Sequence, residues 1–182
     1  FLSSVAFGQT TAIPDANFEQ ALINLGFDNV IDGQVLTANV NSETYLNVTN
    51  ANISDLTGIA AFVALENLGC SNNLLNELDL SNNVNLQVLE CQNNQIINLN
   101  ISNTSLSDIY CDHNNISNID VSSLLNLNVL HIEHNQINNI DLTNNLNLNM
   151  LWIGHNQLTN LDVSNNFYLQ SLICDSNNIS SL

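Results

Sequence analysis

The chain has no lysine and no arginine, whereas 17 of its 182 residues are Asp or Glu, so its formal net charge is −17 with histidine neutral. Charged residues make up only 9% of the chain, so asparagine and serine must supply much of the polar surface. Nucleic acid and anionic membranes are poor partners for such a chain, because phosphate binding needs basic side chains. A basic partner, or divalent cations at the surface, fits this charge. No long apolar run predicts a membrane span, and the length suits one domain.

One motif recurs six times, with a step of 21 residues and a single step of 20. It reads Leu-x-x-Leu-x-(Cys/Ile)-x-x-Asn-x-(Leu/Ile)-x-x-(Leu/Ile), and its copies begin at Leu65, Leu86, Leu106, Leu127, Leu148 and Leu169. This period and core sequence are typical of leucine-rich repeats. The sequence therefore predicts a leucine-rich-repeat solenoid whose stacked coils form a parallel sheet on the concave face.

Alternation within each copy predicts the side chains that point into the solenoid. In the second copy these are Leu86, Leu89, Cys91, Ile96, Leu99 and Ile101. An asparagine follows each strand where the chain turns inward, and we expect its amide to hydrogen-bond free backbone groups of the turn. It occurs at Asn73, Asn94, Asn114, Asn135, Asn156 and Asn177.

Four cysteines would suggest disulfides in an exported protein, but their positions favour another role. Cys70, Cys91, Cys111 and Cys174 all occupy the inward slot that isoleucine fills in other copies. We therefore expect small apolar core residues, and their spacing matches no zinc motif. Because the first three would stack on successive strands, one disulfide among them stays open.

A helix is expected ahead of the repeats, from Pro14 to Gly26. Asp15 suits the N-cap and Gly26 the C-terminal stop, and one apolar face would comprise Phe18, Ala21, Leu22 and Leu25. A degenerate copy follows the helix, with Ala51 in place of the asparagine. Terminal repeats are commonly atypical, so this helix is predicted to cover the open end of the solenoid.

Two segments of this N-terminal region are Pro14-Asp15-x-x-Phe18-Glu19-Gln20-Ala21-Leu22 and Asn52-Ile53-Ser54-Asp55-Leu56-Thr57-Gly58-Ile59. Together with the Leu-x-Cys-x-x-Asn-x-Leu copies, they resemble secreted, internalin-like leucine-rich-repeat proteins of Gram-negative bacteria, many of which are exported by type IX secretion. The resemblance covers residues 12–182. It implies an extracellular or cell-surface binding protein.

Both ends are predicted to be cut from a longer chain. Residues 1–10 resemble the end of a signal peptide, with Ala6-x-Gly8 as a cleavage site before Gln9. The last copy stops in mid-repeat at Leu182, so we expect more sequence after it. The predicted organisation is a signal-peptide remnant at 1–10, an N-terminal helical cap at 11–42 and about seven repeats at 43–182.

The outward residues of the strands are informative about function, because the folding of a coil does not dictate them. All four histidines, the only tryptophan and the only methionine fall on this surface. Clustered aromatic, Met and His side chains on a rigid sheet are typical of a binding face. The predicted patch comprises Tyr110, Val129, His131, Met150 and Trp152, rimmed by Asp112 and Glu133. The alternative is that wide side chains merely fill a curved sheet.

Two ladders raise the question of metal binding. His113, His134 and His155 follow successive strands about 4.8 Å apart, so neighbouring imidazoles are candidates to chelate one ion, with Glu133 as a further ligand. The alternative is that these histidines are ordinary turn residues. The second ladder consists of Asp79, Asp120, Asp141 and Asp162, for which turn hydrogen bonding competes with calcium binding.

No phosphate-binding loop and no nucleophile with base and acid is recognisable, so the sequence predicts neither an enzyme nor a cofactor. The leading hypothesis is a non-catalytic extracellular module that acts as a monomer and binds a protein, with a basic one favoured by charge, or a glycan. Two alternatives stay open. One is a structural or adhesin spacer for a further C-terminal domain, and the other is a metal-binding surface at the three histidines.

Overall fold

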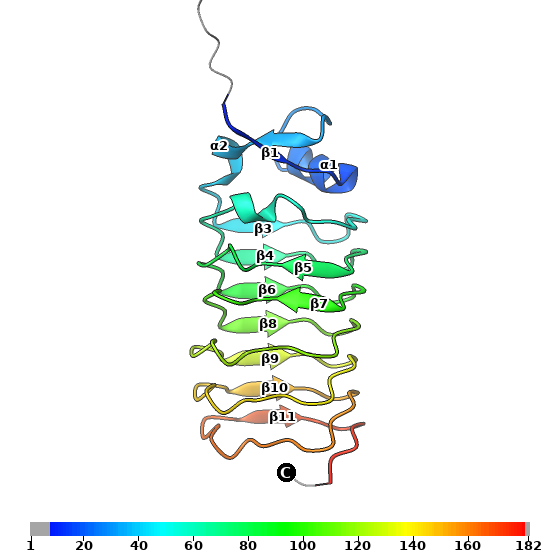
Figure 1. The fold of residues 1–182 in the computed structure, drawn as a ribbon, viewed down its shortest axis with the longest axis vertical. Coiled ribbons are helices and arrows are strands. Elements are labelled where there is room, and N and C mark those ends of the chain that lie inside the picture. Colours follow the sequence, from blue (N-terminus) through cyan, green and yellow to red (C-terminus); the bar gives the residue numbers. More distant parts are fainter. Residues whose placement is uncertain (1–7, 181–182) are drawn as a thin grey trace, which may run out of the picture.

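The computed structural model describes residues 8–180, which form a solenoid of stacked coils (Figure 1). Seven short strands, one per coil, make a parallel sheet in the order β11-β10-β9-β8-β6-β4-β3. Their bounds are β3 Tyr45–Asn47, β4 Asn67–Gly69, β6 Val88–Glu90, β8 Asp108–Tyr110, β9 Val129–His131, β10 Met150–Trp152 and β11 Ser171–Ile173. The predicted parallel-sheet solenoid is confirmed, and the degenerate copy extends the sheet as β3.

The core consists of the inward side chains of successive coils. The middle residue of each strand lies opposite the middle residue of its neighbours, as Leu130 does with Ile109 and Leu151. From Leu46 to Leu151 these middle residues are at most 2% exposed, whereas Leu172 in the last strand is 36% exposed. Burying each such side chain contributes roughly 1.5–3 kcal/mol, so coil stacking supplies most of the stability.

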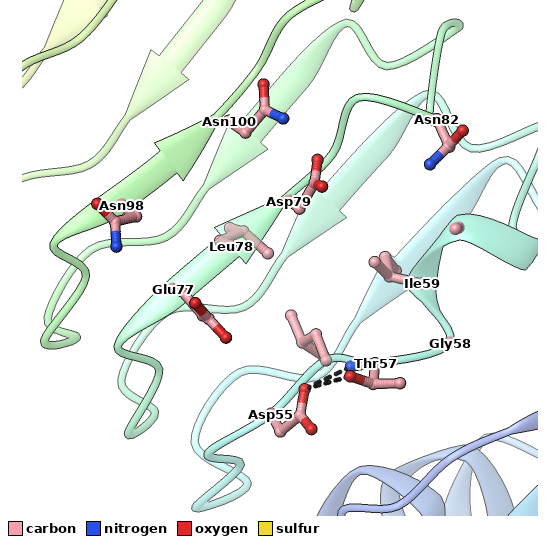
Figure 2. A pocket seen from close by; sticks show the side chains of 12 residues that line it. Asp55, Thr57, Gly58, Ile59, Glu77, Leu78, Asp79, Asn82, Asn98 and Asn100 are labelled. Atoms are coloured by element: carbon pink, nitrogen blue, oxygen red, sulfur yellow. Dashed lines mark hydrogen bonds between the residues drawn. The ribbon is translucent and has the colours of Figure 1, made fainter.

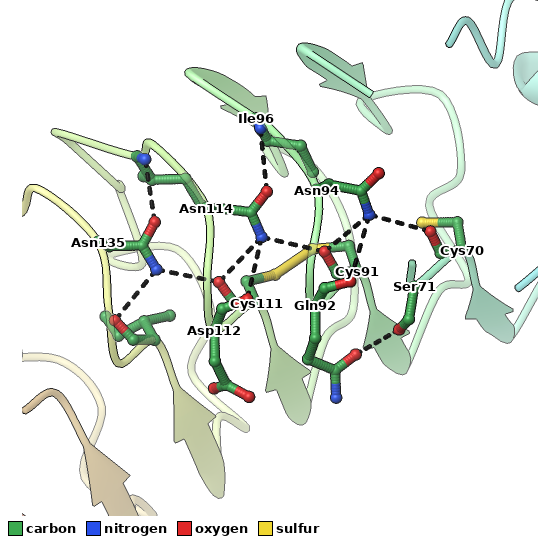
Figure 3. Close-up of a disulfide and its surroundings, with 12 residues drawn as sticks. Cys70, Ser71, Cys91, Gln92, Asn94, Ile96, Cys111, Asp112, Asn114 and Asn135 are labelled. Carbon is green, nitrogen blue, oxygen red and sulfur yellow. Dashed lines mark hydrogen bonds between the residues drawn. A yellow bond between two sulfur atoms is a disulfide. The ribbon is translucent and has the colours of Figure 1, made fainter. Parts of the chain in front are cut away.

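The recurrent asparagine connects neighbouring coils, as Figure 3 shows for three copies. Asn114 Oδ1 accepts a hydrogen bond from the Ile96 N–H at 2.9 Å. Its Nδ2 donates to the carbonyls of Cys91 and Cys111 at 3.0 and 3.2 Å. The same pattern recurs at Asn94, Asn135 and Asn156. The predicted turn role is therefore confirmed, and each amide also bridges two coils.

The cysteines lie in the core, but they are not all free thiols. Cys70, Cys91 and Cys111 are fully buried, as expected of an inward slot. Cys91 and Cys111 form a disulfide, while Cys70 and Cys174 are free (Figure 3). The expectation of four plain core residues is therefore wrong for this pair. The parallel register of β6 and β8 brings the two Cα atoms to 4.9 Å, within bridging range.

The N-terminal segment contains β1 (Thr10–Ala12), α1 (Ala16–Asn24), β2 (Gln34–Leu36) and α2 (Thr37–Val40), with β1 antiparallel to β2. In Figure 1 this segment lies at one end of the stack, next to β3. β1 begins at Thr10, the last residue of the predicted signal-peptide remnant. The rest of that prediction falls mainly on residues 1–7, which lie outside the described residues.

Helix α1 has the predicted caps. Asp15 Oδ1 accepts hydrogen bonds from the backbone N–H groups of residues 17 and 18, and Gly26 ends the helix with a φ of 83°. Asp15 Oδ2 accepts from the backbone and hydroxyl of Ser54, so the same carboxylate ties the helix to the first coil. Phe18 and Leu22 are buried, but Leu25 is 45% exposed because the helix ends before it, at Asn24. Its assignment to the apolar face was wrong.

Glu19 has a role that the sequence did not indicate. The residue is 1% exposed, and its Oε1 accepts hydrogen bonds from the N–H groups of Asp32, Gly33 and Gln34 at 2.7 to 3.0 Å. The carboxylate thereby satisfies three consecutive backbone donors where the chain enters β2.

The side of the solenoid away from the sheet has a second, shorter ladder. β5 (Glu77–Asp79) and β7 (Asn98–Asn100) pair in parallel there, and the 3₁₀ helix η1 (Ile59–Ala61) belongs to the preceding coil. The predicted aspartate ladder lies on this side, and its Oδ1 atoms accept hydrogen bonds from backbone N–H groups two residues later, as Asp120 does from Ser122. Hydrogen bonds from the hydroxyl groups of Ser122, Thr143 and Ser164, and then these backbone bonds, lower the pKa of Asp120, Asp141 and Asp162. Turn hydrogen bonding thus accounts for the ladder.

None of the helices within residues 8–180 has the length and apolar character that crossing a membrane requires.

Candidate functional site

The outward residues of the sheet lie in columns, because the strands pair in register. One column runs from Glu90 through Tyr110, His131 and Trp152 to Ile173, on strands β6 to β11. A parallel column on the same face contains Val88, Asp108, Val129, Met150 and Ser171. The structure therefore brings together the predicted patch residues on three adjacent strands, β8 to β10.

Three rings of the first column form a continuous aromatic stack, which we define as Tyr110, His131 and Trp152. The Tyr110 and His131 rings meet edge to face, with centroids 5.0 Å apart. His131 and Trp152 lie face to face, with centroids 4.0 Å apart and planes inclined by 3°. All three side chains are only half-buried. The stack is therefore ordered by its own contacts while it still presents apolar surface to solvent.

Hydrogen bonding within the stack is incomplete. Trp152 Nε1 donates to Ser171 Oγ at 3.0 Å, which fixes the indole ring on the next strand. His131 Nε2 is shielded from solvent and has no hydrogen-bond partner within residues 8–180. Burial lowers the pKa of His131, which favours the neutral form of its ring.

Val129 does not contribute as the sequence suggested. Its side chain is only 6% exposed, because it lies between Asp108 and Met150 of the neighbouring strands. Val129 therefore supports the patch from beneath instead of offering contact area of its own. Met150, one strand further, is half-exposed beside the stack.

The two predicted rim residues belong to an acidic row, which we define as Asp112, Glu133 and Asp175. They occupy equivalent positions after strands β8, β9 and β11, and Gly154 takes that position after β10. A Cβ atom at Gly154 would lie 2.9 Å from Asp175 Oδ1 and 3.3 Å from Glu133 Oε1. Both carboxylates therefore lean over Gly154 from the strands on either side of it.

The surroundings of Asp112 disfavour the charged form of its carboxyl group. Burial and then repulsion by Glu133 raise its pKa to about 6, although His113 partly offsets both. Asp112 Oδ1 is shielded from water and has no hydrogen-bond partner among the residues that the structure describes. A carboxylate in this state gains from any cation brought to it.

The three histidines of the predicted metal site form a histidine column, His113, His134 and His155. Neighbouring rings are stacked with centroids 4.2 and 4.1 Å apart and planes inclined by 25° and 10°. The lone pair of an imidazole lies in the ring plane, so nearly parallel rings direct their nitrogens side by side and not at one ion. Within residues 8–180 no group of three or more His, Cys, Asp or Glu is arranged to hold a metal ion.

The backbone accounts for this column better than metal binding does. All three histidines have a left-handed conformation, with φ between 52° and 55°. Asn72, Asn93 and Ser176 occupy the same turn position with the same φ range, and asparagine and histidine are favoured there. Burial, then repulsion by its two histidine neighbours, lowers the pKa of His134. His155 Nε2 lies 3.7 Å from Asp175 Oδ2, which links the column to the acidic row.

Comparisons with known proteins identify the fold. No family model and no curated protein matches the chain. Among solved structures, the internalin InlF of Listeria monocytogenes aligns with a TM-score of 0.65 at 18% identity, over 100% of this chain and 62% of that one. Internalin C2 of the same species aligns with a TM-score of 0.60 at 23% identity, over 96% of this chain and 92% of that one.

The chain has the leucine-rich-repeat fold of the internalins. A third Listeria structure, the functional domain of InlJ, includes a cysteine ladder and aligns with a TM-score of 0.47 at 26% identity, over 98% of this chain. The chain spans 62% of the InlF structure and 50% of the InlJ structure. These identities bear on the fold alone.

On this internalin-like scaffold, one depression lies away from the sheet face, and the sequence did not point to it. It has a volume of about 390 Å³ and lies between the Asp55–Ala60 segment and strands β5 and β7. Figure 2 shows Glu77 and Asp79 on one side and Asp55 on the other. Asp55 Oδ1 already accepts hydrogen bonds from the N–H and hydroxyl of Thr57. The Asp55–Ala60 segment on its border belongs to the degenerate copy.

Ser71 follows β4 at the position that Asp112 occupies after β8, and its contacts limit its chemistry. Its Oγ donates to Gln92 Oε1 at 2.5 Å, as Figure 3 shows. The bond holds the hydroxyl toward the neighbouring strand and not toward a histidine.

Proposed function

We propose that this chain is a non-catalytic recognition module that binds a protein partner through the outward face of its seven-stranded sheet. The proposed contact residues are Tyr110, Asp112, His131, Glu133, Met150 and Trp152, with Val129 beneath them. The module is expected to act as a monomer outside the cell or at a bacterial surface. This location fits the internalin-like fold, and export by a type IX system remains part of the proposal.

The single observation that carries this proposal is the aromatic stack. Three neighbouring strands each contribute a ring, and the rings contact one another instead of packing into the core. Preordered rings lose little conformational entropy on binding, which is why rigid aromatic side chains dominate protein interfaces. Core packing requires none of these three residues, since they point away from the core on the outward side of β8 to β10.

A spacer needs no such surface, and a glycan site would use the same rings. Both alternatives can be separated from protein recognition by a selection experiment. A displayed library of random peptides is panned against the purified chain, and the selected peptides are remeasured against two double variants. The test variant is Tyr110→Ala with Trp152→Ala, and the control is Phe167→Ala with Tyr168→Ala.

The control is matched because Phe167 and Tyr168 are also exposed aromatic residues, at 86% and 67%, on a turn away from the sheet. We expect the test variant to weaken peptide binding by at least about 10-fold and the control to leave it within about 2-fold. Peptides that bind both variants equally would place recognition elsewhere. A selection that yields no peptide binder, together with a positive glycan array, would favour the glycan.

A further inference from the structure

We propose that the sheet face binds an arginine-bearing segment of its protein partner, with the guanidinium group held at the acidic row beside Trp152. This inference rests on the proposed function, because it names the kind of partner that the same face takes.

Apart from the histidine column, the ionisable side chains around the aromatic stack and the acidic row are acidic. Glu90 and Asp108 flank the aromatic stack, and the three carboxylates of the acidic row follow it on the same face. The chain has no lysine or arginine that could neutralise them. The raised pKa of Asp112 reports this imbalance at one position, since burial and Glu133 both disfavour its charge. A cationic partner would relieve the repulsion, and electrostatic attraction would also speed its approach.

Gly154 determines the geometry of the acidic row. Because this residue has no side chain, Glu133 Oε1 and Asp175 Oδ1 approach the point where a Cβ would lie to 3.3 and 2.9 Å. The two oxygens are therefore close enough for one planar cation to contact both. A guanidinium offers several N–H donors in one plane, with N–H···O contacts of about 2.7–2.9 Å to carboxylates.

The neighbouring aromatic stack favours arginine over lysine. Trp152 precedes Gly154 by two residues on the same strand face, so a group above Gly154 borders the indole. The His131 ring is stacked on the β9 side of the indole, with centroids 4.0 Å apart, so the face of the indole toward β11 and Asp175 is the one left for a ligand. An arginine stem and guanidinium plane pack on such rings, whereas an ammonium group is a compact and strongly hydrated charge.

Defined probes test the chemistry directly. Hexa-arginine, hexa-lysine and hexa-citrulline peptides are titrated against the full chain by calorimetry at two salt concentrations. Citrulline keeps the shape of arginine but is neutral. We expect hexa-arginine to bind at least about 5-fold more tightly than hexa-lysine, and hexa-citrulline to show no measurable binding.

Two pairs of variants separate the site from general acidity. Glu133→Gln with Asp175→Asn removes two charges at the proposed site, and Asp79→Asn with Asp162→Asn removes two charges on the opposite side. The control substitutions preserve local structure, since Asn100 occupies the equivalent slot naturally in one coil and its Oδ1 accepts the same backbone bond. We expect about a 10-fold loss of hexa-arginine binding for the first pair and less than 3-fold for the second.

A charge-neutral pair tests the geometry. Gly154→Ala would push the flexible carboxylate ends apart without changing the charge, and Gly69→Ala is its control on the same face, where a Cβ would approach the Asn47 amide to 3.2 Å. We expect Gly154→Ala alone to weaken hexa-arginine binding, by about 3- to 10-fold.

Equal losses from the two charge pairs, or equal affinities for hexa-arginine and hexa-lysine, would overturn the inference. Its failure remains distinct from failure of the proposed function. If the library selection yields peptides that need Tyr110 and Trp152 but contain no arginine, the sheet face binds proteins and the assignment of arginine is wrong.

Discussion

Replacing Asn114 by alanine tests the coil-bridging asparagine quantitatively. Asn114 is 7% exposed, and the Ile96 N–H that it accepts from is buried. The substitution leaves this donor without its partner, at a cost of about 1–3 kcal/mol. The carbonyls of Cys91 and Cys111 lose one donor each but keep another, from Asn94 and Asn135 respectively. With roughly 1 kcal/mol for these weakened bonds, the expected destabilisation is about 2–4 kcal/mol.

The assay is urea unfolding, followed both by circular dichroism and by the fluorescence of the only tryptophan. Asn118→Ala is the matched control, because Asn118 is an exposed asparagine in the same coil, and we expect it to cost less than about 0.5 kcal/mol. Asn114→Asp should be worse than alanine at pH 7, since a carboxylate oxygen would then face carbonyl oxygens. If the free energy of unfolding of Asn114→Ala lies within 1 kcal/mol of that of the control, the amide bridges contribute far less than the geometry implies.

Three further outcomes are expected. Asp112→Asn should stabilise the fold by roughly 1 kcal/mol at pH 8 and by almost nothing near pH 3. The folded-state pKa of about 6 lies above the ordinary value of 3.8, so the carboxylate destabilises the fold increasingly as the pH rises from about 4 to about 6, and fully above that; urea unfolding at several pH values checks this. In the same assay Gly58→Ala should lower the free energy of unfolding by roughly 2–4 kcal/mol and Gly33→Ala by about 1 kcal/mol. Both glycines have positive φ, but only at Gly58 would a Cβ collide with backbone. Thiol titration of the unfolded protein should find two thiols before reduction and four after it, because Cys91 and Cys111 are paired; four thiols before reduction would refute the pairing.

Sequence reasoning succeeded where one physical requirement acts on every coil. A side chain that repeats at the inward slot must be buried by the next coil, so the core positions of Leu89 and Cys91 followed from spacing alone. The helix caps at Asp15 and Gly26 could be predicted for a similar reason, since the backbone groups at helix ends require specific partners.

Predictions failed where the outcome depends on a neighbouring side chain. The alternation identifies Val129 as outward, but only the presence of Asp108 and Met150 on both sides buries it. Likewise, Cys91 and Cys111 occupy the slot of an apolar residue, and the repeat does not decide which neighbours pair, since Cys70 lies in the same slot of the coil before Cys91 and is free.

The histidine column shows a third limit. The spacing of His113 and His134 is compatible with chelation, but chelation requires the two ring planes to converge. The two rings instead stack at an inclination of 25°, on a turn position with left-handed backbone. A clue was present in the sequence, because Asn72 and Asn93 occupy the same position in earlier coils and favour the same conformation.

Function on this scaffold is therefore best sought where the outward side chains change in type from one coil to the next. The column that contains the aromatic stack begins with Asn47 and Gly69, which provide little apolar surface, and becomes aromatic only at Tyr110. The core beneath it stays the same over this distance, since Leu68 and Leu130 occupy equivalent buried positions. Packing of the core does not require this change on the outer face. It is the reason that we propose recognition at strands β8 to β10 and not over the sheet as a whole.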